Sequence, residues 1–177
     1  MAVYPAHGVG IIEKIESKKI SGKQQNFYIM NIIENNIKIM IPVDNVCNIG
    51  VRKVIKADYI PEVYKVLRNI EDFYIDRQTW NRRYKEYTDK LKAGSILSVA
   101  EVFRDLYILK LTKTLSFGER KLFDTANSLL VKEIAIAKNT DEKNILFEIE
   151  TLFSELPLDD LKEDNNNPPN GGKEAVE

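Results

Sequence analysis

The spacing of apolar residues changes once along this chain, near residue 57, and this change limits the folds that the chain can adopt. Before it, apolar residues alternate with polar ones or stand in short runs, as they do in β-strands. After it, they recur every three or four residues, as they do in helices that bury one face. We therefore expect an α+β protein of two domains, with a β-domain over residues 1–56 and a helical domain over residues 57–155.

The first domain contains four or five short segments with strand-like patterns. Residues 27–33 are apolar on both faces, as a central strand would be, and Asn35-Asn36 suits the turn that follows. Residues 18–23 are polar and predict another turn. This number of short strands predicts a small twisted β-barrel of the Tudor or SH3 type, a module that binds partners and rarely catalyses reactions.

Residues 37–43 alternate between an apolar side and a side that carries Lys38, Met40 and Pro42. Pro42 has no backbone N–H, so it should lie on an edge strand or at the end of a strand. An edge strand with an exposed apolar residue such as Met40 favours pairing with a strand of another protein. Alternatively, other segments of this chain cover the edge, and the pattern leaves both possibilities open.

Residues 57–155 contain five segments with helical spacing, which predicts a compact five-helix domain. Pro61 suits the first turn of the first helix, and Gly94 suits the end of the second. Ser116 and Glu119 form the pattern of a capping box at the start of the fourth. Residues 156–177 are acidic, rich in Asn, Pro and Gly, and poor in apolar residues, so we expect them to form a disordered tail.

The net charge of −1 is unevenly distributed along the chain. Residues 77–121 carry eleven Lys and Arg but five Asp and Glu, whereas residues 141–177 carry three and eleven. A basic middle segment favours an anion-binding surface beside an acidic end that repels anions. The alternative is that the helices are basic only because their exposed faces are solvated.

Few residues of this chain suit catalysis or metal binding. Cys47 and His7 are the single cysteine and histidine, which excludes an internal disulfide and a multi-histidine metal site. No nucleophile pattern or phosphate-binding glycine loop stands out, so we expect no enzymatic activity and no cofactor. The sequence has no apolar run long enough for a membrane span and no leader-like start, and we expect a cytoplasmic protein.

Residues 79–87 combine the single tryptophan with cations and tyrosines. On a helix, Trp80, Tyr84, Tyr87 and Leu91 share one stripe. Considered alone, this stretch favours a buried core stripe with a solvated basic flank, because most helical aromatics are buried. The competing interpretation is an aromatic wedge flanked by cations, an arrangement that grips nucleic acid.

Five segments occur together and in order over residues 1 to about 155. They are Val3-Tyr4-Pro5-Ala6-His7-Gly8-Val9-Gly10, Met40-Ile41-Pro42-Val43, Thr79-Trp80-Asn81-Arg82-Arg83-Tyr84, Ala100-Glu101-Val102-Phe103-Arg104-Asp105-Leu106-Tyr107 and Leu115-Ser116-Phe117-Gly118-Glu119-Arg120-Lys121. As a set they resemble the CarD/CdnL family of bacterial transcription regulators. Some members carry a basic residue where Met40 stands, so the charge of that surface does not carry over.

The resemblance implies a Tudor-like module that binds the RNA polymerase β subunit, related to the polymerase-interacting module of transcription-repair coupling factors. It also implies a helical domain that contacts DNA at the upstream edge of the transcription bubble. Carried over by position, the polymerase-facing residues are Lys18, Lys38, Met40, Pro42 and Val43. The DNA-contacting residues are Trp80, as a minor-groove wedge, with Arg77, Arg82, Arg83 and Lys85 near the backbone.

With the resemblance included, we favour the wedge for Trp80 and expect a regulator that stabilises the open promoter complex. Its partners would be polymerase and promoter DNA, the latter bound weakly and with little sequence preference, and the protein would be a nucleoid-associated monomer. One alternative is a promoter-specific DNA-binding repressor that acts without polymerase. Another is a protein–protein adaptor in which Trp80 belongs to the core.

Overall fold

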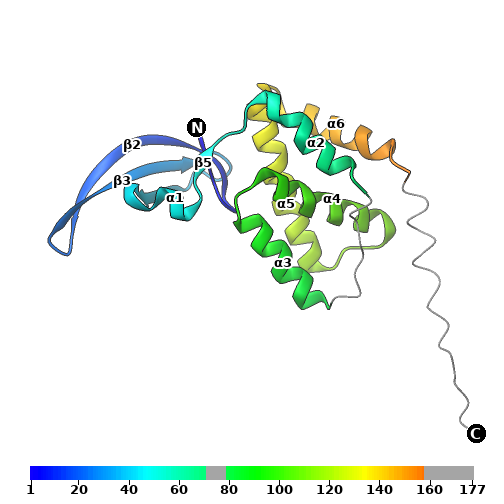
Figure 1. Ribbon diagram of the computed structural model, residues 1–177, viewed down its shortest axis with the longest axis horizontal. Coiled ribbons are helices and arrows are strands. Elements are labelled where there is room, and N and C mark those ends of the chain that lie inside the picture. The colour runs from blue at the N-terminus through cyan, green and yellow to red at the C-terminus, as the bar shows by residue number, and fades with distance from the viewer. Residues whose placement is uncertain (71–78, 158–177) are drawn as a thin grey trace, which may run out of the picture.

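The computed structural model describes residues 1–70 and 79–157. An antiparallel sheet lies at one end of the molecule and a group of helices at the other (Figure 1). The strands are β1 (Ala2–Tyr4), β2 (Gly8–Ile20), β3 (Lys23–Ile32), β4 (Lys38–Pro42) and β5 (Arg52–Lys53). The helices are α1 (Val46–Ile49), α2 (Ile60–Arg68), α3 (Trp80–Lys92), α4 (Ile96–Thr112), α5 (Phe117–Lys138) and α6 (Glu142–Ser154). The expected α+β fold, a β-domain followed by a helical domain, is confirmed.

The strands follow the order β4-β3-β2-β1-β5, so β4 and β5 are the two ends of the sheet. Pro42 is the last residue of the end strand β4, as predicted from its missing N–H. The turn at Asn35-Asn36 is also confirmed, and Asn36 adopts the left-handed conformation with φ 55°. One face of the sheet packs Met30, Ile32 and Ile41 into a small core, against which α1 contributes Val46 and Ile49.

The polar turn predicted over residues 18–23 is present, but it is shorter than predicted. Strand β2 continues to Ile20 and β3 begins at Lys23, so Lys18 lies within a strand and pairs with Gln25. Only Ser21 and Gly22 make the turn, both with positive φ. A two-residue turn of this kind matches the twist of paired strands and lets the ladder continue up to it. The result is a long β2–β3 hairpin that projects away from the helices (Figure 1).

The helical domain is built around α4, which packs against α2, α3 and α5, while α6 packs against α5. Its core joins apolar residues from all five helices α2–α6. The predicted helix signals are confirmed: Pro61 lies in the first turn of α2, and Gly94 follows α3 with φ 75°. Within the described ranges, no helix is long and apolar enough to cross a membrane.

Candidate nucleic-acid and protein interfaces

Trp80 is the first residue of α3 and rests on the first turn of α5. A Cβ added to Gly118 would lie 2.6 Å from Cζ2 of the tryptophan, closer than two such carbons can approach. Glycine at position 118 is therefore what allows the ring to lie so close to this turn. The ring is partly buried and packs against the helical core, so Trp80 combines parts of both interpretations: it contacts the core and keeps some solvent exposure.

Two side chains from the next turn of α3 flank the ring. The Tyr84 ring lies 5.4 Å from it, centroid to centroid, and is 42% exposed. The Arg83 guanidinium carbon lies 6.0 Å from the Trp80 centroid, within range of a cation–π contact. The solvent exposure of the predicted stripe therefore varies along α3: Leu91 is buried, whereas Tyr84 is exposed.

Glu119 ties this aromatic pair to the cap of α5. Its carboxylate accepts hydrogen bonds from the Ser116 backbone N–H at 2.8 Å, from Lys113 at 3.1 Å and from Arg83 at 3.3 Å. The Ser116 hydroxyl accepts from the Glu119 N–H in return, which confirms the predicted capping box. Burial acts to raise the pKa of Glu119, but the hydrogen bonds from Ser116 and Lys113 outweigh it and hold the pKa below its ordinary value. A charged Glu119 therefore holds Arg83 in place beside Trp80.

The cations predicted to contact DNA differ in their surroundings. Arg82 and Lys85 are exposed and form no ion pair with any residue that the structure describes. Arg83 is partly buried in its ion pair with Glu119. Arg77 lies outside the described residues. Arg82 and Lys85 are thus available to an external anion, whereas Arg83 already helps to orient the tryptophan.

Phe117 is a candidate contact residue that the sequence analysis did not single out. It is the first residue of α5 and is 86% exposed, next to the Gly118 that supports Trp80. Arg120 and Lys121 follow on the same side of α5, and both are exposed. The available signal was the capping box, which places residue 117 at the first position of the helix.

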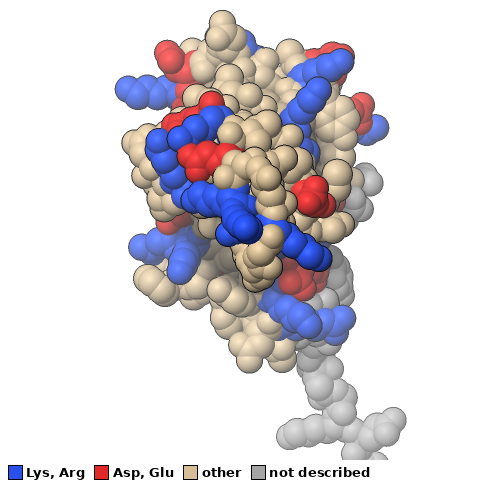
Figure 2. Space-filling view, turned by 90° about the vertical axis from the view of Figure 1, so that its left-hand side faces the viewer, with Lys and Arg blue, Asp and Glu red and all other residues tan. Residues whose placement is uncertain are grey.

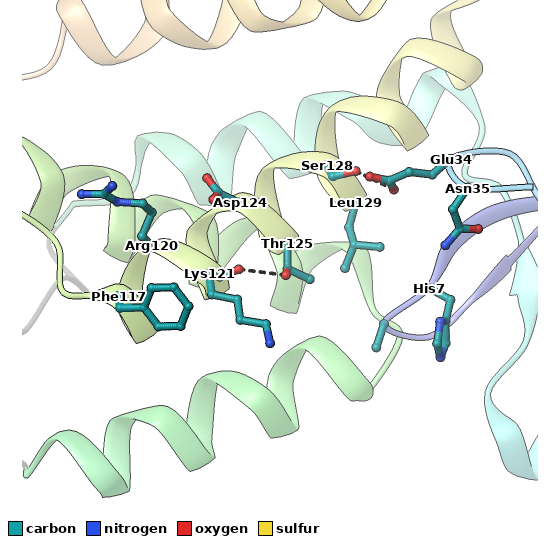
Figure 3. A pocket seen from close by; sticks show the side chains of 11 residues that line it. His7, Glu34, Asn35, Phe117, Arg120, Lys121, Asp124, Thr125, Ser128 and Leu129 are labelled. Atoms are coloured by element: carbon teal, nitrogen blue, oxygen red, sulfur yellow. Dashed lines mark hydrogen bonds between the residues drawn. The ribbon is translucent and has the colours of Figure 1, made fainter. Parts of the chain in front are cut away.

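A cleft of about 470 Å³ separates this end of α5 from the β-domain. Figure 3 shows Phe117, Arg120 and Lys121 on its helical side and His7 and Asn35 on its β side. Four further residues of α5 line it, namely Asp124, Thr125, Ser128 and Leu129. The aromatic and basic surface that begins at Trp80 therefore continues along α5 towards the sheet.

The residues predicted to face polymerase gather on the other face of the sheet, away from its small core. Strand alternation puts Lys38, Met40 and Pro42 on one side, and Lys18 reaches Met40 with Nζ 3.4 Å from the sulfur. Phe27 and Ile29 pair in register with Pro42 and Met40 on the neighbouring strand, and both are buried. Val43 lies just beyond the strand, in a short 3₁₀ turn over residues 43–45.

Charges on this face are partly paired with one another. Lys38 bonds to Glu13 at 2.8 Å, and this bond lowers the pKa of Glu13 below its ordinary value. Glu16 pairs with Lys14 and Lys18. Seen from the hairpin end, Lys and Arg side chains are spread over the surface with acidic ones among them (Figure 2). The face therefore offers a mixed pattern of charges around the exposed Met40.

The family models identify both halves of the molecule. Residues 1–55 match the CarD-like/TRCF RID domain, a polymerase-interacting module, and residues 62–150 match the CarD C-terminal domain. A protein of Bacillus subtilis (strain 168), named "Putative transcription factor YdeB", is 36% identical over 144 residues, which is 81% of this chain and 92% of that protein. The chain therefore belongs to the CarD-like family of transcription factors, which regulate transcription and are not enzymes.

Proposed function

We propose that this protein stabilises the open promoter complex by holding polymerase and DNA at the same time. The β4 edge and the face with Lys18, Lys38 and Met40 dock on the polymerase β subunit. This docking brings Trp80 to the minor groove at the upstream edge of the bubble. Unstacking a base step costs a few kcal/mol, and at this junction the opening has already been made.

The observation that carries the proposal is the way in which Trp80 is held. Its ring is anchored on Gly118 and flanked by Arg83 and Tyr84, so it is rigid before any ligand arrives. A rigid aromatic loses little entropy on insertion. A wedge that fits only the opened duplex shifts the closed–open equilibrium by its differential affinity, and no chemical step is needed.

The surroundings of Trp80 support binding without strong sequence readout. Arg82, Lys85, Arg120 and Lys121 are placed to neutralise phosphates, which are the same for every sequence. The minor groove itself presents a degenerate pattern. We therefore expect weak, salt-sensitive binding of free DNA and a much larger effect when polymerase is present.

The test combines a pull-down with a lifetime measurement. The purified protein should co-purify with polymerase core through the β subunit and should lengthen the lifetime of open complexes on promoter DNA. Tight binding to one promoter sequence without polymerase would instead identify a promoter-specific repressor. Binding to polymerase without any effect on the open complex would identify an adaptor.

A further inference from the structure

Helix α5 reaches from the Trp80 site to the β-domain. Its first turn supports Trp80 through Gly118, and its later turns contact the β-domain through Ser128, Leu129 and Glu133. Sixteen residues separate Phe117 from Glu133, a helical span of about 24 Å. The placement of the tryptophan relative to the sheet therefore depends on how firmly the β-domain is held against α5.

Arg52 and Glu133 form a bidentate ion pair at the junction between the β-domain and α5. Glu133 is 3% exposed, and both of its oxygens bind the Arg52 guanidinium, at 2.5 and 2.9 Å. The same carboxylate accepts the Ile55 backbone N–H at 3.1 Å. Arg52 also donates from Nε to the Gly94 carbonyl at 2.6 Å, in the turn between α3 and α4. Four groups from three separated parts of the chain are thus joined at one point.

Other apolar and polar contacts also hold the β-domain against the helical domain. Pro5 lies against Gly50 and Gly94, where a Cβ on Gly94 would come within 2.9 Å of the proline ring. Glu34 in the β3–β4 turn accepts a hydrogen bond from Ser128 at 2.7 Å. The Arg52–Glu133 pair differs from these contacts because its carboxylate is buried, its geometry is bidentate and both partners also bond to the backbone. A bidentate guanidinium–carboxylate pair fixes direction as well as distance.

We infer that Arg52 and Glu133 are positioning residues, which set the β-domain and the Trp80 site at the spacing that polymerase and DNA present. The inference rests on the proposed function. When one molecule binds two linked sites, the second contact gains from a high effective concentration only if the geometry permits both at once. If the contact between the two domains is loosened, each domain still binds its own partner, but much of the gain in affinity from binding polymerase and DNA together is lost.

The test uses the full-length variant Glu133→Gln, which keeps the shape of the side chain and removes its charge. Binding to polymerase core without DNA, and to DNA without polymerase, should each change less than about twofold. The increase in open-complex lifetime should fall about tenfold or more, since linked binding adds roughly 10²–10⁴ in favourable cases. Arg52→Lys keeps the charge but not the bidentate geometry and should fall between wild type and Glu133→Gln.

A matched control is Glu148→Gln, which breaks ion and hydrogen bonds to Lys138 and Tyr64 within the helical domain. It should leave the open-complex lifetime unchanged. A direct measure of the junction uses spin labels on the exposed Cys47 and on a Lys143→Cys site in α6. The distribution of distances between the labels should broaden in Glu133→Gln and stay narrow in Glu148→Gln.

The outcomes separate this inference from the proposed function. If the wild-type protein does not lengthen the open-complex lifetime, the proposed function fails. If it does, and Glu133→Gln performs equally well or keeps a narrow label distribution, the positioning role is overturned. A Glu133→Gln protein that loses both separate affinities to the same degree as the combined effect also overturns it, because the pair would then serve folding alone.

Discussion

At the scale of the residue, the half-buried ring of Trp80 sets the expected result of Trp80→Ala. Full burial of a tryptophan would cost roughly 3–5 kcal/mol on truncation, and the anchored half of this ring should cost about 1–2 kcal/mol. Removal of one stacking interaction should weaken the open-complex effect by about 1–3 kcal/mol, which is roughly five- to a hundredfold. Thermal melting and open-complex lifetimes of the same preparation measure the two effects.

Two further variants distinguish the shape of the ring from its position. Trp80→Phe keeps an aromatic plane and should retain part of the effect. Gly118→Ala leaves the tryptophan in the chain but pushes the ring off its support, because the added Cβ would meet it at 2.6 Å. A Trp80→Ala protein that melts far below Gly118→Ala and wild type would assign the tryptophan to the core.

Glu119 predicts a pH dependence of stability. Its pKa in the folded protein lies below the ordinary value of 4.5. Its stabilising effect is therefore complete above pH 4.5 and is lost as the pH falls below that value through the lowered pKa. Glu119→Gln should lower the free energy of unfolding near neutral pH by about 1–3 kcal/mol. As the pH falls through the lowered pKa, the stabilities of the two proteins should converge. Urea titrations at several pH values would instead show a constant difference in the free energy of unfolding if this carboxylate were not responsible.

Sequence patterns located Trp80 but not its support. The aromatic–basic stretch and the capping box were both readable from the sequence, and each was found. Their contact was not readable, because Gly118 and Trp80 are 38 positions apart and meet only through helix packing. For the same reason Arg83 was predicted to bind DNA, while its pairing with the buried Glu119 went unseen.

At the scale of the element, strand β4 predicts where polymerase docks. The double variant Lys38→Glu with Met40→Glu places two negative charges on an exposed face, so it should abolish binding to polymerase. Both side chains are exposed, so the melting temperature should change little. The matched control is Lys23→Glu at the hairpin tip, which changes the charge without touching β4. If the double variant still co-purified with polymerase, the docking site would have to lie elsewhere on the protein.

The exposed cations near the start of α3 should affect the salt dependence of DNA binding, whereas Trp80 should not. Arg82→Glu and Lys85→Glu should each weaken DNA binding, and more strongly at low salt, because they act through phosphate charge. The slope of log affinity against log salt should become shallower by about one for each phosphate that the variant no longer neutralises. Trp80→Ala should shift the affinity and leave that slope unchanged, which gel shifts over a range of salt concentrations can resolve.

Strand and helix periods located most elements correctly, but they overestimated the length of one turn and did not predict α1. The alternation over residues 37–43 predicted β4 and its edge position, and helix signals predicted α2, α3 and α5. The polar run at residues 18–23 was misassigned because hairpin strands beyond the core expose both faces to water. Polar composition there reflects exposure and gives no indication of where the strand stops.

At the scale of the whole molecule, the cores predict that the last twenty residues are dispensable for folding. Every buried residue of the two described cores lies at or before Phe153. A protein that ends at Pro157 should unfold cooperatively, with a melting temperature close to that of the full chain. Loss of cooperative unfolding, followed by circular dichroism, would contradict this. The domain limits of 1–56 and 57–155 stay a prediction, which limited proteolysis can test.

The relation between the two domains was beyond the reach of sequence reasoning. Arg52 and Glu133 are 81 positions apart, and neither stands in a pattern that suggests a partner. From the sequence alone, a glutamate within a helix is assigned to the solvent-exposed polar face. Its burial can be recognised only when the position of the neighbouring domain is known. Local periods indicate the helices and strands within each domain, whereas contacts between distant elements, including those of the junction, follow only from packing.

The edge strand β4 also bears on how the protein behaves at high concentration. An open edge is the usual starting point for uncontrolled self-association and fibril growth. Strand β4 has five residues, and it begins with a lysine and ends with a proline. The strand at the opposite end of the sheet, β5, has two residues, Arg52 and Lys53. A short edge that begins with a charge and ends with a residue lacking an N–H offers few backbone partners to identical copies of itself, so we expect the purified protein to stay monodisperse at high concentration, which light scattering can check.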